Sequence, residues 1–246
     1  MKFMKESYFD VTWIGQGGFI FETSGGKTLL VDPYLSSSVE AENGLKRLQE
    51  VIIEPEDIIA DLVLCTHDHL DHLDPDSIIK ISESCNTKFG GPSSVCVHLR
   101  KLGLSRDRII EINREEIKVI KGVSITATYA KHTGDSVGYL FNFDDIKVYI
   151  TGDTEYDSKL MGVKRYKPNV MLACINGKWG NMNIEEAIKL TLYIEPEIVI
   201  PMHYGMFAEN TANPEEFAHE LKKSGSLSKT VILNYCKPFI YFSKTV

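Results

Sequence analysis

Residues 61–74 of this chain read DLVLCTHDHLDHLD, an apolar run that leads directly into three histidines and three further aspartates. The run at 61–65 is typical of a short buried β-strand. Loops that leave the ends of strands are free to carry functional side chains. The spacing H-x-H-x-D-H places His67, His69, Asp71 and His72 around one common space. These residues are therefore the strongest candidates for a functional site.

Imidazole nitrogens and carboxylate oxygens are ligands that suit Zn²⁺, Mn²⁺ and Fe²⁺ without any thiolate. The alternative is a polar loop that only caps the following helix. It explains Asp74, which precedes Pro75 at the expected helix start, but it leaves the three histidines unexplained. The motif therefore predicts a metal site. Asp68 and Asp74 are better interpreted as supporting or capping residues than as metal ligands.

Three more polar residues stand at the ends of predicted strands. His132 follows the predicted strand at 124–129, Asp153 follows that at 147–152, and His203 follows that at 197–202. Each alone is more typical of a hydrogen-bonded core or loop residue. Together, however, these places and the motif take five of the seven histidines. We therefore expect the later residues to complete a site with two metal ions.

The remaining apolar patterns divide the chain into two similar halves. Strands are expected at 9–14, 18–23, 28–31, 61–66, 87–90, 108–112, 117–119, 123–129, 137–143, 147–151, 170–175, 198–201, 231–233 and 239–242. Helices are expected at 75–84, 92–102, 183–193 and 214–223, with a short one around 45–51 in the otherwise polar segment 36–57. Each half runs as a meander followed by strand–helix units, an order that two face-to-face mixed sheets with outer helices satisfy. We predict one α/β domain over 1–246, a four-layer αββα sandwich.

Composition limits the function classes. The 246 residues are 43% hydrophobic and 25% charged, which excludes a disordered chain, a collagen-like repeat and a small disulfide scaffold. The formal net charge of −7 disfavours nucleic acid and anionic membranes as partners. With no apolar run of membrane-spanning length, we expect no membrane span. The five widely spaced cysteines predict reduced thiols and a cytoplasmic location.

The motif set resembles that of the metallo-β-lactamase superfamily: H-x-H-x-D-H, a later His, a Gly-Asp-Thr after a strand, and a final His at a strand end. The chain is most similar to the branch that contains L-ascorbate-6-phosphate lactonase. The matching pieces are WIGQGG at 13–18, THDHLDHLD at 66–74, VIPMH at 199–203 and NPEEF at 213–217. The resemblance covers the chain from residue 13 to about residue 242 and implies the metallo-β-lactamase fold.

The resemblance also implies a division of the ligands between two divalent ions. One ion is expected on His67, His69 and His132, and the other on Asp71, His72 and His203, with Asp153 bridging them. The resemblance favours Zn²⁺ or Mn²⁺, and Fe²⁺ is also compatible with these ligands. The implied activity is that of a metal-dependent hydrolase in which a hydroxide shared by the ions opens an ester or lactone bond. Asp71 is the expected catalytic residue, since it can orient this hydroxide or carry its proton.

Candidate substrate contacts lie in loops expected at the same rim. In the glycine-rich stretch 176–181, Lys178 can attract an anionic group and Trp179 can form a wall for a sugar or acyl chain. A turn with a solvated lysine and a packed tryptophan explains this stretch equally well. Tyr204, beside His203, is a third candidate, and either residue can assist the leaving alkoxide. We therefore expect a small, anionic, sugar-phosphate-like substrate.

Two other function classes fit the same ligands. One is a phosphodiesterase or nuclease of the same superfamily, although a nuclease would ordinarily show a basic surface. The other is a metal-binding protein without catalysis. A homo-oligomer is compatible with the sequence, and the polar segment 36–57 is expected to be a lid or an interface.

Overall fold

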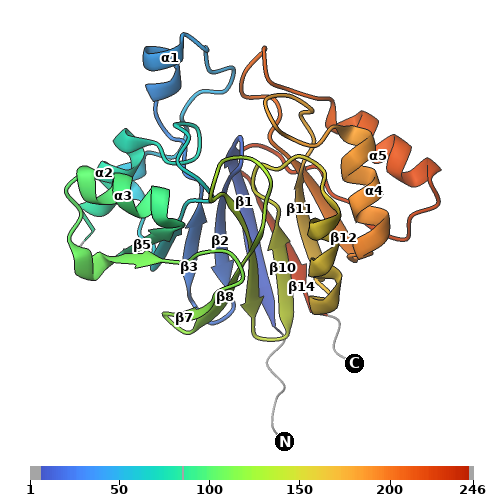
Figure 1. The fold of residues 1–246 in the computed structure, drawn as a ribbon, viewed down its shortest axis with the longest axis horizontal. Coiled ribbons are helices and arrows are strands. Elements are labelled where there is room, and N and C mark those ends of the chain that lie inside the picture. Colours follow the sequence, from blue (N-terminus) through green and yellow to red (C-terminus); the bar gives the residue numbers. More distant parts are fainter. Residues whose placement is uncertain (1–6, 85, 244–246) are drawn as a thin grey trace, which may run out of the picture.

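Two mixed β-sheets form the centre of the protein (Figure 1). The structure is a computed structural model that describes residues 7–84 and 86–243. Within these residues the first sheet has the strand order β14-β1-β2-β3-β4-β5-β6. Its strands are β1 (Tyr8–Gly15), β2 (Gly18–Thr23), β3 (Thr28–Val31), β4 (Leu62–Leu64), β5 (Lys88–Gly91), β6 (Ile109–Glu111) and β14 (Pro238–Phe242). The antiparallel meander β1–β3 thus continues into parallel strands β4–β6.

The second sheet repeats this arrangement with the order β13-β12-β11-β10-β9-β8-β7. Its strands are β7 (Ile117–Ile120), β8 (Val123–Tyr129), β9 (Val137–Phe143), β10 (Ile146–Ile150), β11 (Val170–Cys174), β12 (Ile198–Met202) and β13 (Lys229–Thr230). Strands β7 to β10 pair antiparallel, and β10 to β13 pair parallel. The meander followed by strand–helix units that the sequence predicts is therefore present in both halves.

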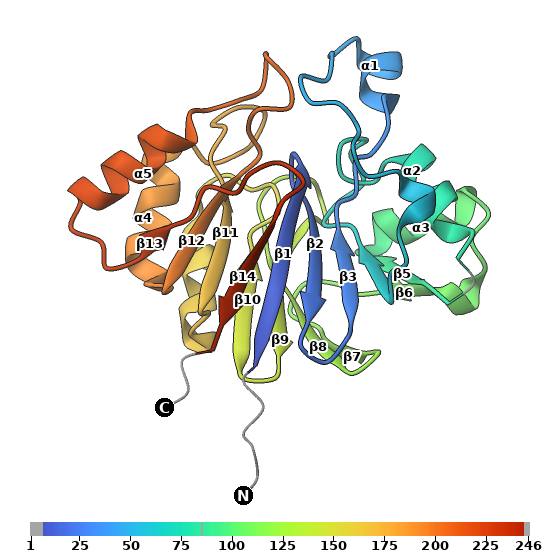
Figure 2. The same ribbon diagram turned by 180° about the vertical axis from the view of Figure 1, so that it is seen from behind.

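Helices cover the outer faces of the two sheets (Figures 1 and 2). The helices of the described residues are α1 (Ser38–Asn43), η1 (Pro55–Asp57), α2 (Pro75–Ser82), α3 (Ser93–Lys101), η2 (Arg106–Arg108), η3 (Ser158–Tyr166), α4 (Ile184–Ile194) and α5 (Pro214–Lys223). Helix α3 packs on β5 and β6, whereas α4 and α5 pack on β11 and β12. The predicted αββα layering is confirmed. No helix within the described ranges combines the length and the apolar character that a membrane crossing needs.

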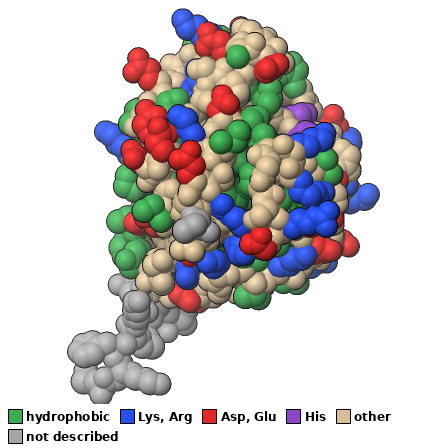
Figure 3. All heavy atoms as spheres, turned by 90° about the vertical axis from the view of Figure 1, so that its left-hand side faces the viewer, with side chains coloured by type: hydrophobic (Ala, Val, Ile, Leu, Met, Phe, Trp, Pro, Cys, Tyr) green, Lys and Arg blue, Asp and Glu red, His purple; other side chains and the backbone are tan. Residues whose placement is uncertain are grey.

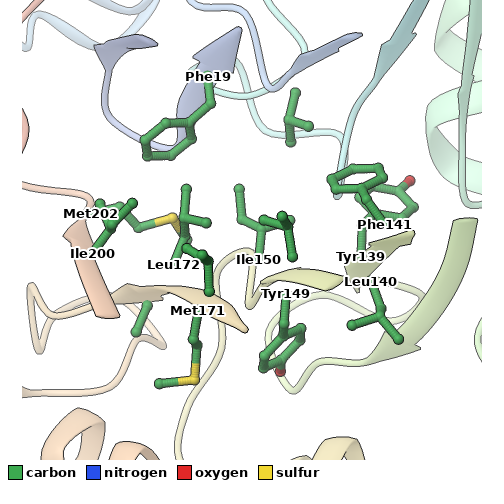
Figure 4. Packing of buried hydrophobic residues seen from close by; sticks show 14 of the residues in the cluster. Phe19, Tyr139, Leu140, Phe141, Tyr149, Ile150, Met171, Leu172, Ile200 and Met202 are labelled. Atoms are coloured by element: carbon green, nitrogen blue, oxygen red, sulfur yellow. The ribbon is translucent and has the colours of Figure 1, made fainter. Parts of the chain in front are cut away.

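The core lies between the sheets and continues under the helices. In Figure 4, Ile150 of β10 and Leu172 of β11 point towards Phe19 of the first sheet, whereas Tyr149 and Met171 point to the opposite face. All five side chains are fully buried. A strand that is buried on both faces reads as a continuous apolar run, because alternate side chains point to opposite sides. This double burial fixes the strand ends that carry the site.

Two predicted elements are wrong. The helix expected around 45–51 is absent; the segment 36–57 instead begins with α1 at Ser38–Asn43, which ends at Gly44 in the left-handed conformation with φ 71°. The residues after α1 instead form hydrogen bonds with other parts of the chain. Arg47 donates to the carbonyl oxygen of Tyr34, and the Leu48 amide donates to the carbonyl oxygen of Met206. The strand expected at 231–233 is also displaced, because β13 pairs with β12 only through Lys229 and Thr230.

The thiols of Cys65, Cys96, Cys174 and Cys236 are free. The fifth cysteine, Cys85, lies outside the described residues.

Candidate metal centre

Loops from both sheets meet at the carboxyl ends of four strands. The H-x-H-x-D-H loop follows β4 of the first sheet, whereas His132, Asp153 and His203 follow β8, β10 and β12 of the second. Three groups of these side chains each bring their nitrogen or oxygen atoms within 4.8 Å of one another. The structure thus brings together all seven residues that the sequence singled out as ligands.

The first cluster consists of three imidazoles. Nε2 of His67 lies 3.0 Å from Nδ1 of His69, and the same Nδ1 lies 3.2 Å from Nε2 of His132. On its other side, Nδ1 of His132 lies 3.0 Å from the carbonyl oxygen of Gly180. A carbonyl oxygen only accepts, so Nδ1 of His132 carries the hydrogen and Nε2 keeps its lone pair for the cluster.

The second cluster consists of Asp71, His72 and His203. Oδ2 of Asp71 lies 3.7 Å from Nε2 of His72 and 3.6 Å from Nε2 of His203. The rings of His72 and His203 are stacked with their centroids 5.4 Å apart. Both imidazoles are almost completely buried, while the Asp71 side chain keeps 19% of its surface exposed. The cluster is therefore open to solvent on the side of Asp71.

One carboxylate oxygen lies between the two clusters. Oδ2 of Asp153 is 3.1 Å from Nε2 of His203, 3.4 Å from Nε2 of His72 and 3.8 Å from Nε2 of His132. The amide Nδ2 of Asn181 donates to this oxygen over 2.8 Å and fixes its direction. Asp153 is therefore placed to contact groups held by either cluster.

The donor atoms fit divalent metal ions. Nε2 of His72 and Oδ1 of Asp153 are buried and have no hydrogen-bond partner among the described residues. Buried polar atoms in this condition are rare in proteins because they are costly unless another group satisfies them. Imidazole nitrogens and carboxylate oxygens at this spacing bind Zn²⁺, Mn²⁺ or Fe²⁺. The same atoms that lack hydrogen bonds are thus those that an ion would engage.

The pKa shifts show which ligands are ready to bind an ion and which must first lose a proton. Burial, reinforced by His72, lowers the pKa of His67 well below its usual value. Burial acts in the same direction on His203, but Asp153 and Asp71 outweigh it and raise the pKa of His203 to about 9. Burial would raise the pKa of Asp153, but the neighbouring His203 and His72 hold it well below its usual value. Neutral imidazoles and ionised carboxylates are the forms that bind metals, so His67 and Asp153 are ready to bind an ion, whereas His203 must release its proton when an ion binds.

Asp32 supports this centre and was missed in the sequence. Its fully buried carboxylate accepts hydrogen bonds from the amide and hydroxyl of Thr66, both over 2.7 Å, and lies 2.8 Å from Nδ1 of His72. A carboxylate at Nδ1 keeps the hydrogen on that nitrogen and aims the lone pair of Nε2 at the centre. The available signal was an aspartate at the end of a predicted strand, at the same sheet edge as the motif.

Gln16 and Gly17 form a second support, in the turn between the strands predicted at 9–14 and 18–23. The side-chain Nε2 of Gln16 donates to Oδ2 of Asp71 over 2.9 Å, and the backbone carbonyl oxygen of Gln16 accepts from the backbone amide of His203 over 3.1 Å. A Cβ on Gly17 would lie 2.9 Å from Cε1 of His72, closer than real contacts allow. The turn between β1 and β2 thus packs directly against the second cluster.

Known proteins are similar to this chain in sequence and in fold. A model of the Beta-lactamase superfamily domain matches residues 10–203. A UPF0173 metal-dependent hydrolase of Methanopyrus kandleri is 32% identical over 237 residues, covering 91% of this chain and 96% of that protein. The chain belongs to the UPF0173 metal-dependent hydrolase family.

Other UPF0173 proteins are similar over most of their length. The relative from Methanosarcina mazei is 30% identical over 221 residues, covering 84% of this chain and 88% of that protein. Among solved structures, Igni18, a metallo hydrolase of Ignicoccus hospitalis, is 26% identical with a TM-score of 0.79, covering 96% of this chain and 100% of that one. This UPF0173 protein is thus a metal-dependent hydrolase of the metallo-β-lactamase superfamily. Its relation to the ascorbate-6-phosphate lactonases stays a prediction.

A cavity of about 450 Å³ opens beside the clusters of this UPF0173 hydrolase. His69, Asp71, His132, Asp153 and His203 line its floor. Its walls come from the segment 39–45, the loop 207–210 and the loop 179–181. A volume of this size suits a small-molecule substrate. The segment 36–57 therefore contributes to the site, as one wall.

Of the three candidate substrate contacts, Trp179 alone lines this cavity, with 58% of its surface exposed. The Nζ amine of Lys178 donates to the carbonyl oxygen of Glu209 over 2.8 Å, and Lys178 lines a separate cavity of about 790 Å³ between α4 and α5. That larger cavity contains no residue of either cluster. Tyr204 is 7% exposed and packs on Trp13 with ring centroids 4.9 Å apart. The structure does not bring Lys178 or Tyr204 to the metal centre cavity.

The two remaining aspartates of the motif are supporting residues. Asp74 is buried and accepts hydrogen bonds from the Leu35 amide over 3.3 Å and from Ser36 Oγ over 2.8 Å. Asp68 lies at the cavity rim, 3.8 Å from Nδ1 of His98. Asp74 thus joins the H-x-H-x-D-H loop to the start of the segment 36–57.

Proposed function

We propose that this protein hydrolyses an ester or lactone bond of a small molecule with two divalent ions. One ion is held by His67, His69 and His132. The other is held by Asp71, His72 and His203, and Asp153 contacts both. The observation that carries this proposal is the position of Oδ2 of Asp153, within 3.1–3.8 Å of imidazoles from both clusters. Zn²⁺ or Mn²⁺ is favoured, and Fe²⁺ is compatible with the same donors.

When bound, such ions polarise the substrate carbonyl and lower the pKa of a water molecule towards neutrality. The chain's own residues supply charge and proton transfer. Asp71 borders the cavity, and the Gln16 amide fixes one of its oxygens. Asp71 is therefore placed to orient the attacking water, take its proton and return it to the leaving alkoxide. Asp153, held by Asn181, offsets positive charge between the clusters.

Turnover by the metal-loaded protein tests this proposal. A lactone, a carboxylic ester, a phosphodiester and a β-lactam are incubated with protein loaded separately with Zn²⁺ and Mn²⁺. We expect hydrolysis of the lactone or the ester, and a loss of at least about 100-fold in kcat for Asp71→Asn. Asp68→Asn, in the same loop but outside both clusters, is the matched control. Exclusive cleavage of the phosphodiester would instead support the phosphodiesterase class. No turnover at all would support a metal-binding protein without catalysis.

We further propose that this protein acts in the cytoplasm on a small-molecule substrate. The described cysteines are free thiols, and three of them are buried, as is usual in reducing compartments. The substrate partner is a small molecule because the cavity beside the clusters measures about 450 Å³.

A further inference from the structure

The cavity beside the metal centre has an apolar upper wall. Val39 and Leu45 reach it from the segment 36–57, Leu70 from the H-x-H-x-D-H loop, and Phe207 from the loop after β12. Leu45 and Leu70 pack against the buried group that Val39 and Phe207 form with Tyr34 and Met206. The wall is thus an extension of a small hydrophobic core.

Among the described residues that line this cavity, none is Lys or Arg, and Asp68 adds a carboxylate beyond those of the metal centre. Three lysines are next to lining residues in the sequence. Lys178 donates to Glu209 and Lys131 pairs with Glu155 over 2.6 Å, whereas the exposed Lys46 follows Leu45 without lining the cavity. No lysine or arginine of the described lining can therefore bind a phosphate or carboxylate on the substrate.

Basic side chains gather elsewhere, on the flank that carries α2 and α3 (Figure 3). Two of them, Arg100 and Arg106, line a separate hollow beside β6. Lysine and arginine side chains that could pair with an anionic group therefore lie on this flank, and not at the cavity wall.

The segment 36–57 holds its wall position through Arg47. Its Nη1 donates to the carbonyl oxygens of Tyr34 and Ser36 over 3.0 and 2.9 Å, and its guanidinium lies 4.5 Å above the Tyr34 ring. The neighbouring Leu48 amide donates to the Met206 carbonyl oxygen over 2.8 Å. These bonds tie the start of the segment to Arg47 and the loop after β12 to the adjacent Leu48. Leu45 is therefore part of a fixed wall.

We infer that the substrate is uncharged away from the scissile bond and carries an apolar acyl or alkyl group. This group packs against the half-buried Leu45 and Leu70, which the buried Val39 and Phe207 support from behind. This inference rests on the proposed function, which places the scissile carbonyl at the clusters. The apolar wall stabilises each buried methylene by the usual hydrophobic free energy. A carboxylate or phosphate on the same group would lose water without gaining a positive partner.

A matched pair of metal-directed probes tests the inference without turnover. Hexanohydroxamic acid and adipic acid monohydroxamate share one metal-binding end and differ in a terminal methyl or carboxylate. Binding to the metal-loaded protein is measured by isothermal titration calorimetry. We expect the hexanoyl probe to bind at least about tenfold more tightly. We also expect affinity to rise about fourfold per methylene from the butanoyl to the hexanoyl probe.

Variants in the wall supply the matched control. Leu45→Lys places a positive charge at the wall, and we expect the preference for the hexanoyl probe to fall by about fivefold or more. Leu48→Lys makes the same change three residues further along, at a leucine that is 54% exposed and does not line the cavity. We expect Leu48→Lys to leave the preference unchanged.

The outcomes separate this inference from the proposed function. Equal or tighter binding of the adipic probe to the wild-type protein would overturn the inference, even where esters are hydrolysed. No binding of either probe would overturn it as well. A tenfold preference in a protein that hydrolyses no ester or lactone would support the inference about the wall and overturn the proposed hydrolysis.

Discussion

Asp32 is the residue through which the first sheet positions the second cluster, and Asp32→Asn isolates that role. The buried carboxylate receives the Thr66 amide, the Thr66 hydroxyl and Nδ1 of His72. In Asp32→Asn, the side-chain oxygen still accepts a hydrogen bond from the backbone N–H of Thr66, and the Thr66 hydroxyl can turn to accept one hydrogen of the new side-chain NH₂ group. The remaining amide hydrogen faces Nδ1 of His72, which must then give up its hydrogen. The proton moves to Nε2, the nitrogen that faces Asp153 at 3.4 Å.

The size of the effect follows from the loss of this orientation. Replacing a residue that orients a metal-binding histidine lowers metal affinity by about 10- to 100-fold, or about 1.4–2.7 kcal/mol. We expect the larger loss at the ion on Asp71, His72 and His203, because Asp32 contacts His72 directly and reaches His67 of the other cluster only through the Thr66 hydroxyl. The ion on the other three histidines is expected to keep its affinity within about threefold.

A chelator competition titration with Zn²⁺ measures both affinities separately. Asp61→Asn is the control, because Asp61 also accepts a backbone amide, that of Thr28 over 3.2 Å, but contacts no histidine. We expect this control to bind both ions like the wild-type protein. Unchanged affinity for both ions in Asp32→Asn would refute the reasoning, as would an equal loss at the two ions.

Three further expectations concern the turn, the ions and the core. Gly17→Ala puts a Cβ 2.9 Å from the His72 ring, so we expect the affinity for the ion on Asp71, His72 and His203 to fall about 10-fold or more. Gly25→Ala, where the nearest atom to the new Cβ is 3.6 Å away, is the neutral control. An equal loss of affinity in Gly25→Ala would contradict this prediction. Removing metal with a chelator should lower Tm by about 5–10 °C per ion, relative to the protein in metal at about 100 times its Kd. An unchanged Tm in calorimetry would argue against bound ions. Phe141→Ala removes a fully buried ring between the sheets and should destabilise the protein by about 3–5 kcal/mol in urea unfolding, whereas a loss below about 1 kcal/mol would show that the ring is not packed as described.

The fold was largely predictable from the chain because burial on two faces leaves a clear pattern. The continuous apolar runs 147–151 and 170–175 predict buried strands, and the structure places β10 and β11 there. The segment 36–57 was not predictable, since its conformation depends on distant groups: Arg47 donates to Tyr34 and Ser36, and the Leu48 amide donates to Met206. Local pattern contains no information about such partners.

Part of the candidate site was also predictable from the sequence, and part was not. The H-x-H-x-D-H spacing, together with two histidines and one aspartate at strand ends, singled out seven residues that the structure brings together. Single residues such as Asp32 and Gln16 contribute through contacts 40 and 55 positions away in the chain, to His72 and Asp71. Neither the strand-end position of Asp32 nor the WIGQGG piece around Gln16 indicates these partners. The direction in which a loop side chain points was also not predictable from the local sequence. Lys178 and Trp179 are neighbours, yet only Trp179 lines the cavity beside the clusters.

The measurement that tests the central claim most directly is anomalous diffraction from crystals of the metal-loaded protein at the absorption edge of the bound metal. We expect two peaks, one among His67, His69 and His132 and one among Asp71, His72 and His203, with Asp153 between them. A single peak, or peaks that leave Asp153 outside contact distance of either ion, would contradict the proposed two-ion centre.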